Sequence, residues 1–271
     1  MNGLTEASIL SLESPLARVV EVHEALGSTQ ERARELARGG AHHGTLVVAG
    51  VQTGGRGRLR RAWGSPEGGL WMSLVLRPNL EAAAAPRLTQ AAAVAVAKAL
   101  REIGANVGIK WPNDLLVEPG GRKICGILAE SSIRAAGRGE APRVDHAVLG
   151  VGLNANLDLE DLGVTDREVA TLRCELGRDL DPLDLLRRLL QNLDAELERV
   201  HDFAVILDDW RVLSVTLGER VRVTRLGEVL EGLAVDVSPE GALLLQTRDG
   251  VLELYEGEVE RLLREGDAYT S

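Results

Sequence analysis

Apolar residues in the first 210 positions of the chain follow two different spacings. Some stretches are apolar at nearly every position or at every second position, as strands are, and others repeat apolar residues every third or fourth position, as amphipathic helices do. The pattern predicts strands over 19–22, 46–51, 70–76, 109–111, 115–117, 124–128 and 146–153, and helices over 28–38, 86–103 and 182–200. Strands and helices do not alternate as regularly as in a doubly wound sheet, so an α+β domain is predicted.

The start and the end of the first helix are marked by their residue types. Ser28 stands three residues before Glu31, which is the spacing of a capping box, and Gly39–Gly40 is a typical helix end. Ser28 is therefore predicted to cap the helix.

The pattern changes after Trp210, where short β-rich segments are separated by glycine, proline and aspartate. Strands are predicted over 220–224, 229–237, 242–247 and 251–255. About fifty residues of this kind predict a small antiparallel β-barrel with its own core. We therefore divide the chain into residues 1–212 and residues 213–271.

The composition is that of a globular protein, with 45% hydrophobic and 27% charged residues among 271. No apolar run reaches the ~18 residues that a membrane helix needs, and the N-terminus lacks the features of a signal peptide. We therefore expect a cytoplasmic protein that has no membrane contact. Cys125 and Cys174 stand far apart without a CxxC pattern, so we expect two inert thiols rather than a disulfide or a zinc site.

The net charge of −10 disfavours a general nucleic-acid binder, since non-specific DNA affinity comes mainly from neutralising phosphates. Functional cations must then be concentrated locally. Arg56, Arg58, Arg60 and Arg61 lie within six residues of one another, inside a glycine-rich segment.

The segment Gln52–Arg58 reads Gln-Thr-Gly-Gly-Arg-Gly-Arg. Its glycines let a ligand lie against the backbone, whose N–H groups can bind anions, and its arginines match carboxylate and phosphate oxygens. The segment therefore predicts an anion-binding loop, with a basic surface linker as the alternative. No GxxxxGK[ST] P-loop is present, and Gly150–Gly152 leads into Asn154 rather than into a dinucleotide-binding helix.

Two further polar groups interrupt apolar strands. Lys110-Trp111-Pro112-Asn113-Asp114 places Asp114 where it could hold Mg²⁺ near phosphates, although an Asx turn is the simpler interpretation. In the segment 122–128, Lys123 at the start of an apolar strand is either a solvated strand end or a cation directed into a pocket. Gly126 within that strand permits close approach of a ligand.

Taken in order, these groups closely resemble the catalytic domain of the biotin–protein ligases, and the C-terminal segment resembles the SH3-like domain that follows it. The resemblance rests on Ser28-Thr29, Gln52 to Arg58, Trp63, Lys110 to Asp114, Arg122 to Leu128 and Leu149 to Asn154. It implies a mixed-sheet catalytic domain followed by a small SH3-like β-barrel. It also implies an enzyme that forms biotinyl-AMP from biotin and ATP with Mg²⁺, and then transfers biotin to a lysine of a biotin carboxyl carrier protein.

The resemblance assigns a role to each motif. It implies that Arg58 and Lys123 act at the reacting oxygens. It implies that biotin is bound by Ser28, Thr29, Gln52, Gly55, Arg56, Gly57, Arg58, Lys123, Gly126, Gly150, Gly152 and Leu153. It implies that ATP or the adenylate is bound by Arg56, Arg58, Trp63, Lys110, Asn113, Asp114, Lys123 and Asn154, with Asp114 as the metal ligand.

Three residues depart from the family pattern: Gln30 where asparagine is usual, Arg60 where a glycine often stands, and Cys125 in place of a small apolar residue. Fewer than thirty residues precede Ser28, so we expect a ligase that does not itself bind DNA. The sequence leaves open whether the chain forms a homodimer.

Two other functions are compatible with parts of the sequence. A lipoate–protein ligase shares the fold and the acyl-adenylate, but the arginine–glycine loop and Lys-Trp-Pro-Asn-Asp favour biotin. A single-stranded nucleic-acid binder could use the same loop together with a β-barrel, and the acidic net charge disfavours it.

Overall fold

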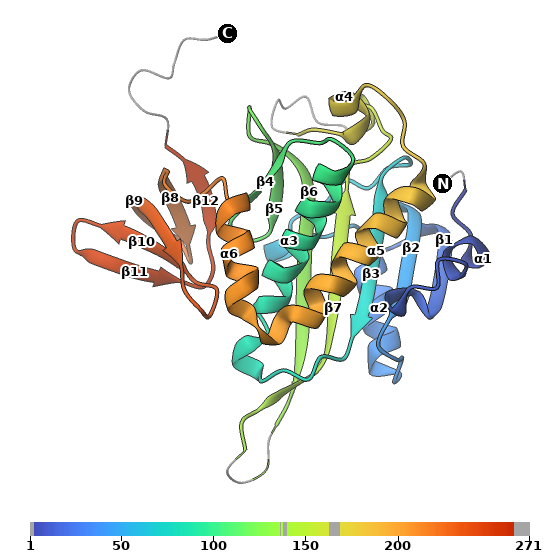
Figure 1. The fold of residues 1–271 in the computed structure, drawn as a ribbon, viewed down its shortest axis with the longest axis horizontal. Coiled ribbons are helices and arrows are strands. Elements are labelled where there is room, and N and C mark those ends of the chain that lie inside the picture. Colours follow the sequence, from blue (N-terminus) through green and yellow to red (C-terminus); the bar gives the residue numbers. More distant parts are fainter. Residues whose placement is uncertain (1–2, 136, 138–139, 163–168, 263–271) are drawn as a thin grey trace.

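The larger part of the molecule is built on a seven-stranded mixed sheet (Figure 1). The computed structural model describes residues 3–135, 137, 140–162 and 169–262. The strand order is β1-β2-β3-β7-β6-β5-β4, in which β1 and β2 are parallel and the other neighbours are antiparallel. The strands are β1 (Val19–Leu26), β2 (Thr45–Gln52), β3 (Leu70–Leu76), β4 (Val107–Lys110), β5 (Asp114–Val117), β6 (Arg122–Arg134) and β7 (Arg143–Leu153).

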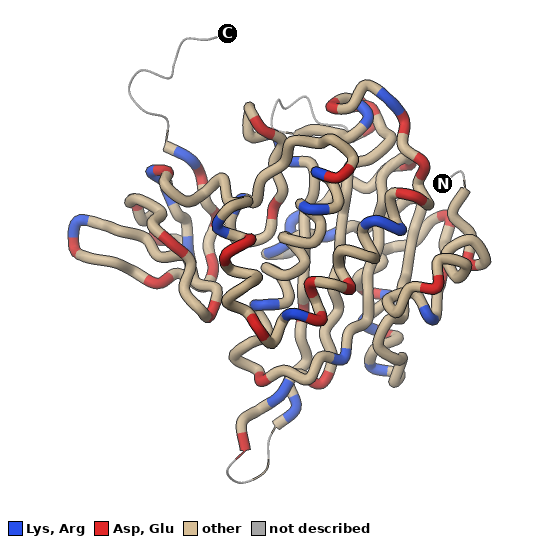
Figure 2. Tube along the Cα trace, in the orientation of Figure 1, with Lys and Arg blue, Asp and Glu red and all other residues tan. Residues whose placement is uncertain are grey.

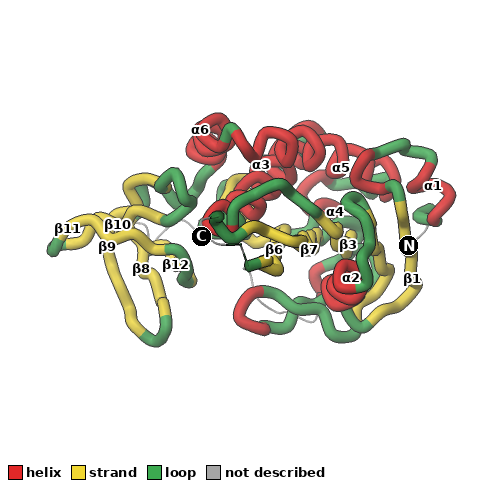
Figure 3. Tube along the Cα trace, turned by 90° about the horizontal axis from the view of Figure 1, so that it is seen from below, coloured by secondary structure: helices red, strands yellow, loops and turns green. Residues whose placement is uncertain are grey.

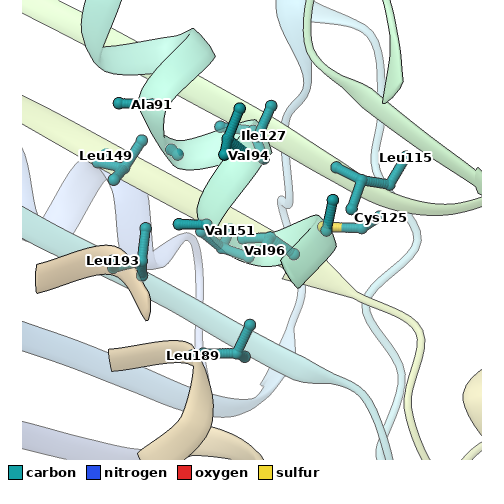
Figure 4. Close-up of a cluster of buried hydrophobic side chains, with 14 of the residues drawn as sticks. Ala91, Val94, Val96, Leu115, Cys125, Ile127, Leu149, Val151, Leu189 and Leu193 are labelled. Atoms are coloured by element: carbon teal, nitrogen blue, oxygen red, sulfur yellow. The ribbon is translucent and has the colours of Figure 1, made fainter. Parts of the chain in front are cut away.

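Helices cover the two faces of this sheet unequally (Figures 1 and 3). One face is covered by α3 (Arg87–Glu102), α5 (Pro182–Glu198) and α6 (Phe203–Leu213), whereas α2 (Thr29–Arg38) lies on the other. Two short helices, α1 (Glu6–Leu10) and α4 (Leu172–Leu176), complete this domain. Small side chains bring α3 close to the sheet, and Figure 4 shows Ala91, Val94 and Val96 packed among Cys125 and Val151.

The C-terminal domain is a five-stranded antiparallel sheet of order β11-β10-β9-β8-β12. It contains β8 (Arg220–Arg225), β9 (Glu228–Val237), β10 (Leu243–Thr247), β11 (Gly250–Leu254) and β12 (Glu258–Arg261). This architecture confirms the predicted fold class, a mixed-sheet domain followed by a small β domain. The strands and helices predicted from the apolar pattern do not include α1, α4, α6 or β12.

Only part of the α2 face of the sheet is packed against a helix. Ala33 and Ala37 of α2 pack on Val47, Val75 and Val148, which form a small core of their own. Because successive side chains of a strand point to opposite faces, the residues two and four positions along from Val75 and Val148 lie on this same face, beyond the helix. These positions hold Ser73 and Trp71 along β3, and Gly150 and Gly152 along β7.

Charged residues of both signs are interspersed over the two domains (Figure 2). No helix in the described part of the chain is long and apolar enough to cross a membrane.

Candidate functional site

A cavity of about 280 Å³ lies on the open part of the α2 face, between the sheet, the glycine-rich loop and the C-terminal domain. The loop closes on itself through backbone hydrogen bonds from Trp63 N to Gly55 O (2.9 Å) and from Gly57 N to Arg61 O (2.9 Å). The predicted residues that line the cavity are Ser28, Thr29, Gln52, Arg56, Gly57, Arg58, Trp63, Lys110, Asn113, Asp114, Lys123, Gly126, Gly150 and Gly152. Motifs that are far apart in the sequence therefore meet in one place.

Three predicted contact residues do not belong to the cavity wall. Leu153 is fully buried and follows Gly152 on β7, so its side chain points to the opposite face, into the helix-covered core. Asn154 is buried and donates from Nδ2 to Ala170 O at 3.0 Å. Gly55 lies inside the loop, where an added Cβ would stand 2.5 Å from Trp63 O. These three residues therefore lie outside the cavity lining, and their contact with a ligand stays a prediction.

The floor of the cavity is made of glycine and is covered by Trp63. A Cβ added at Gly126 would lie 3.3 Å from the indole ring of Trp63, and one added at Gly152 would lie 2.6 Å from its Nε1. Lys123 Nζ lies 4.9 Å from the centroid of the same ring, a cation–π distance. The buried Trp63 Nε1 has no hydrogen-bond partner among the residues that the structure describes. The glycines are therefore needed for close contact with an aromatic ring.

The N-terminus of α2 brings polar side chains to one end of the cavity. Ser28 caps the helix as predicted, accepting a long hydrogen bond from Glu31 N (3.5 Å). Thr29 donates from its backbone N to Gln52 Oε1 at 2.9 Å, and its hydroxyl lies 3.1 Å from the same atom. Ser73 on β3 lies 2.9 Å from the Thr29 hydroxyl.

Gln30 and Ser73 also line the cavity, although neither was predicted as a site residue. Gln30 is buried and reaches from α2 across the sheet, where it bonds to β3, β6 and β7. Strand alternation carried the signal for Ser73, which stands on the same face as Val75. The departure from the family pattern at Gln30 therefore lies inside the site.

Three cations at the site are paired with carboxylates of the chain itself. Arg56 contacts Glu31 at 2.8 Å, and Lys123 Nζ contacts Asp114 Oδ1 at 2.7 Å. Arg61 pairs with Glu258 of β12, and this hydrogen bond holds the pKa of the Glu258 carboxyl below its usual value. These cations are already neutralised without a ligand.

Arg58 differs from the other arginines of the loop. Its Nη1 lies 3.2 Å from Asn113 Oδ1 and 3.4 Å from Gly257 O, and it forms no ion pair within the described parts of the chain. Burial lowers the pKa of its guanidinium, and the nearby Asp114 carboxylate partly opposes this shift. A half-buried cation without an ionic partner is available to pair with a ligand anion.

The C-terminal domain forms part of the cavity wall through Gly257, Glu258 and Val259. No site residue was predicted in this domain, because nothing in its local pattern shows which surface of the catalytic domain it faces. Arg60 belongs to the loop, but its side chain lies outside the described residues.

Asp114 and Glu258 are carboxylates that line the cavity, and Asp114 is the one predicted from the sequence to hold a metal. No group of three or more histidine, cysteine, aspartate or glutamate side chains suited to a metal occurs in the described residues. A single carboxylate with phosphate oxygens and waters is a usual magnesium environment, so Asp114 and its neighbour Asn113 fit a magnesium ion that arrives with a nucleotide.

The sequence of the chain was compared with protein families and with known proteins, and it matches ligases that act on biotin or lipoate. The model of the biotin/lipoate A/B protein ligase family matches residues 22–154, and that of the biotin protein ligase C terminal domain matches residues 216–262. The chain is 37% identical over 243 residues to the bifunctional ligase/repressor BirA of Bacillus subtilis, covering 88% of this chain and 72% of that protein. The chain belongs to the biotin protein ligase family.

Other members share both sequence and fold with this ligase. It is 34% identical over 229 residues to the biotin–[acetyl-CoA-carboxylase] ligase of Paracoccus denitrificans, covering 81% of this chain and 90% of that one. A biotin protein ligase from Aquifex aeolicus, solved in complex with biotin and ATP, matches with a TM-score of 0.73 and 29% identity over 90% of this chain and 99% of that chain. The resemblance predicted from the motifs is thus confirmed.

Proposed function

We propose that this ligase joins biotin to ATP as biotinyl-5′-AMP and then transfers the biotinyl group to a lysine of a biotin carboxyl carrier domain. In the first step a biotin carboxylate oxygen attacks the α-phosphorus, and pyrophosphate leaves. In the second, the lysine amine attacks the acyl carbon, and AMP leaves. The main observation behind this proposal is that one cavity is lined by three kinds of residue: cations from the loop and from β6, hydroxyl side chains, and glycines.

The polar end of the cavity is the place for the ureido ring of biotin. Ser28, Thr29 and Gln52 offer hydroxyl and amide groups there, while Gly150 and Gly152 leave room against the backbone. A ring with N–H and C=O groups satisfies buried polar side chains that an apolar ring would leave without partners.

The cationic end is the place for the reacting carboxylate and phosphates. Arg58, Lys110 and Lys123 stand where negative charge develops, and preorganised charges of this kind often contribute more to catalysis than any other single effect. Lys123 would exchange Asp114 for a phosphate oxygen. Asp114 and Asn113 would hold Mg²⁺, which when bound helps to neutralise the phosphates.

The acceptor is proposed from the relatives' names, since those of Paracoccus denitrificans and Mycobacterium tuberculosis are biotin–[acetyl-CoA-carboxylase] ligases. We propose a biotin carboxyl carrier domain of that carboxylase or of a related one as partner.

The test is ATP–pyrophosphate exchange with biotin or lipoate, without and then with a carrier domain. We expect exchange that depends on biotin and Mg²⁺ without the carrier, followed by labelling of one carrier lysine. Exchange with lipoate instead of biotin would reassign the substrate, and no exchange with either would refute the proposal.

A further inference from the structure

Four polar side chains beneath the cavity form a continuous chain of hydrogen bonds that has a fixed direction. The chain runs from Thr29 Oγ1 to Ser73 Oγ (2.9 Å), and from Ser73 Oγ to Gln30 Oε1 (3.1 Å). Gln30 Nε2 then donates to Glu130 Oε2 (2.9 Å) and to Val148 O (3.1 Å). Ser73 is fully buried, and Thr29 and Gln30 are nearly so.

The far end of the chain fixes which way the Gln30 amide points. A carboxylate and a carbonyl oxygen only accept hydrogen bonds, so the atom between Glu130 and Val148 has to be the amide nitrogen. Gln30 Oε1 therefore faces Ser73 as an acceptor. Ser73 has one proton, and it goes to Gln30.

The orientation of the Gln30 amide also determines which hydroxyl donates in the hydrogen bond between Thr29 and Ser73. The Thr29 and Ser73 oxygens are 2.9 Å apart, and two oxygens stay that close only with a proton between them. Since the proton of Ser73 is committed to Gln30, the proton between them is that of Thr29. Gln52 Oε1 supplies no proton, because it is an acceptor that receives hydrogen bonds from Thr29 N at 2.9 Å and from the Thr29 hydroxyl at 3.1 Å.

Ser28, the neighbour of Thr29 at the cavity wall, is available as a hydrogen-bond donor instead of an acceptor. Its Oγ accepts from Glu31 N (3.5 Å) and donates no hydrogen bond to any described residue. Its proton is free for a ligand oxygen, whereas Thr29 has only lone pairs to offer. A donor beside an acceptor fits a ring in which C=O is bonded to N–H.

We propose that Gln30 and Ser73, oriented by Glu130, are positioning residues that make Thr29 a pure hydrogen-bond acceptor and so select a ligand ring with an N–H group. The inference rests on the proposed function, in which Thr29 contacts the ureido ring of biotin. It explains why Gln30 reaches across the sheet. Gly150 leaves room for it, because a Cβ there would stand 2.6 Å from Gln30 Oε1.

The test compares biotin with its two cyclic carbamate analogues, in each of which one ring N–H is replaced by oxygen. Titration calorimetry gives the affinities without turnover. The wild-type protein should reject the analogue that places oxygen against Thr29. In Gln30→Leu, Ser73 can donate to Thr29, whose own proton is then no longer needed between the two hydroxyls and can turn to Gln52 or to a ligand oxygen. We expect the preference for biotin over that analogue to fall about tenfold or more.

Two further variants test whether Gln30 and Ser73 act through the hydrogen-bond chain or only support the structure. Ser73→Ala should relax the preference as Gln30→Leu does, and the double variant should relax it no further, since both act through one chain. Arg34→Met is the matched control, because Arg34 contacts Glu130 Oε1 (3.5 Å), whereas Gln30 bonds to Glu130 Oε2. It should keep the wild-type preference.

The possible results of the calorimetry are distinct. If Gln30→Leu weakens the affinities for biotin and for the analogue equally, so that their ratio is unchanged, the proposed role of Gln30 and Ser73 is wrong. The proposed function would remain intact. Failure of the wild-type protein to bind biotin at all would overturn both.

Discussion

Arg58 carries a charge that the rest of the site leaves free. Its guanidinium is half-buried, is held by an amide and a carbonyl oxygen, and lines the same cavity as the Lys123–Asp114 pair. Arg56 and Arg61, by contrast, begin with carboxylate partners and more exposed side chains. We therefore propose that an adenylate gains most from Arg58, because no existing ion pair is lost.

Replacing Arg58 by alanine is predicted to speed release of biotinyl-AMP about a hundredfold, which corresponds to about 3 kcal/mol of charge-assisted hydrogen bonds. Single-turnover release of labelled adenylate measures this rate. Arg61→Ala is the control from the same loop and should change the rate only a few-fold. Equal effects in both variants would contradict the special role of Arg58.

Cys125 shows how burial determines a residue's chemistry. It is packed between α3 and the sheet (Figure 4), and burial strongly raises the pKa of its thiol. Because the thiolate is the reactive form, we expect this cysteine to be unreactive in the folded protein near neutral pH. Cys174 is exposed.

A thiol-specific reagent is predicted to modify one cysteine in the native protein at pH 8 and both after denaturation. Mass spectrometry of the labelled peptides identifies the site. Native labelling at Cys125 would show that the sheet opens far more readily than its packing implies.

At the scale of elements, three helices are joined by an ionic cluster. Lys98 of α3 contacts Glu196 of α5 and Asp209 of α6, both at 2.7 Å. Arg199 contacts the same two carboxylates at 3.0 and 3.7 Å. The Glu196 side chain is only 4% exposed, so it depends on these cations for its charge to be tolerated.

Lys98→Met is predicted to lower the free energy of unfolding by about 2 kcal/mol, because Arg199 compensates only in part for the loss. Urea denaturation measures it. Arg187→Met on α5 removes an exposed pair with Asp184 and should cost at most about 1 kcal/mol. If both variants lose similar amounts of unfolding free energy, the cluster stabilises the protein no more than an exposed ion pair does.

Elements with a strong apolar period were predictable from the sequence, and those defined by tertiary contact were not. Strand β12 has one buried residue, Val259, and exists because it pairs with β8. Helix α6 did carry a signal, since Phe203, Ile206 and Trp210 follow a helical spacing. The same alternation that places Gly152 in the cavity directs the Leu153 side chain to the opposite face, which the sequence pattern alone could have shown. Gln30 was not predictable, because its reach across the sheet depends on Gly150.

At the scale of the whole molecule, the two domains share buried contacts. Trp111 is fully buried and donates from Nε1 to Gly241 O (3.3 Å) and from its backbone N to Thr216 Oγ1 (2.9 Å). Gln90 of α3 donates to the same Gly241 carbonyl at 2.9 Å. Because the C-terminal domain also supplies the cavity wall, separating the domains would open the site.

The chain is therefore predicted to unfold in one thermal transition, with equal calorimetric and van't Hoff enthalpies. Differential scanning calorimetry tests this. Trp111→Phe keeps an aromatic ring but removes the bond to Gly241 and should lower stability by about 1 kcal/mol without splitting the transition. Two resolved transitions in the wild-type protein would show that the domains are independent.

The pairing of Arg56, Lys123 and Arg61 with Glu31, Asp114 and Glu258 also bears on which solutes the enzyme ignores. A lone sulfate or phosphate ion can replace one carboxylate at a time and gains little by doing so. A nucleoside triphosphate or an adenylate carries several phosphate oxygens in one molecule and can displace several of these carboxylates at once. We therefore expect a lone inorganic anion to compete weakly at these three cations and to bind best beside Arg58, which has no carboxylate to give up.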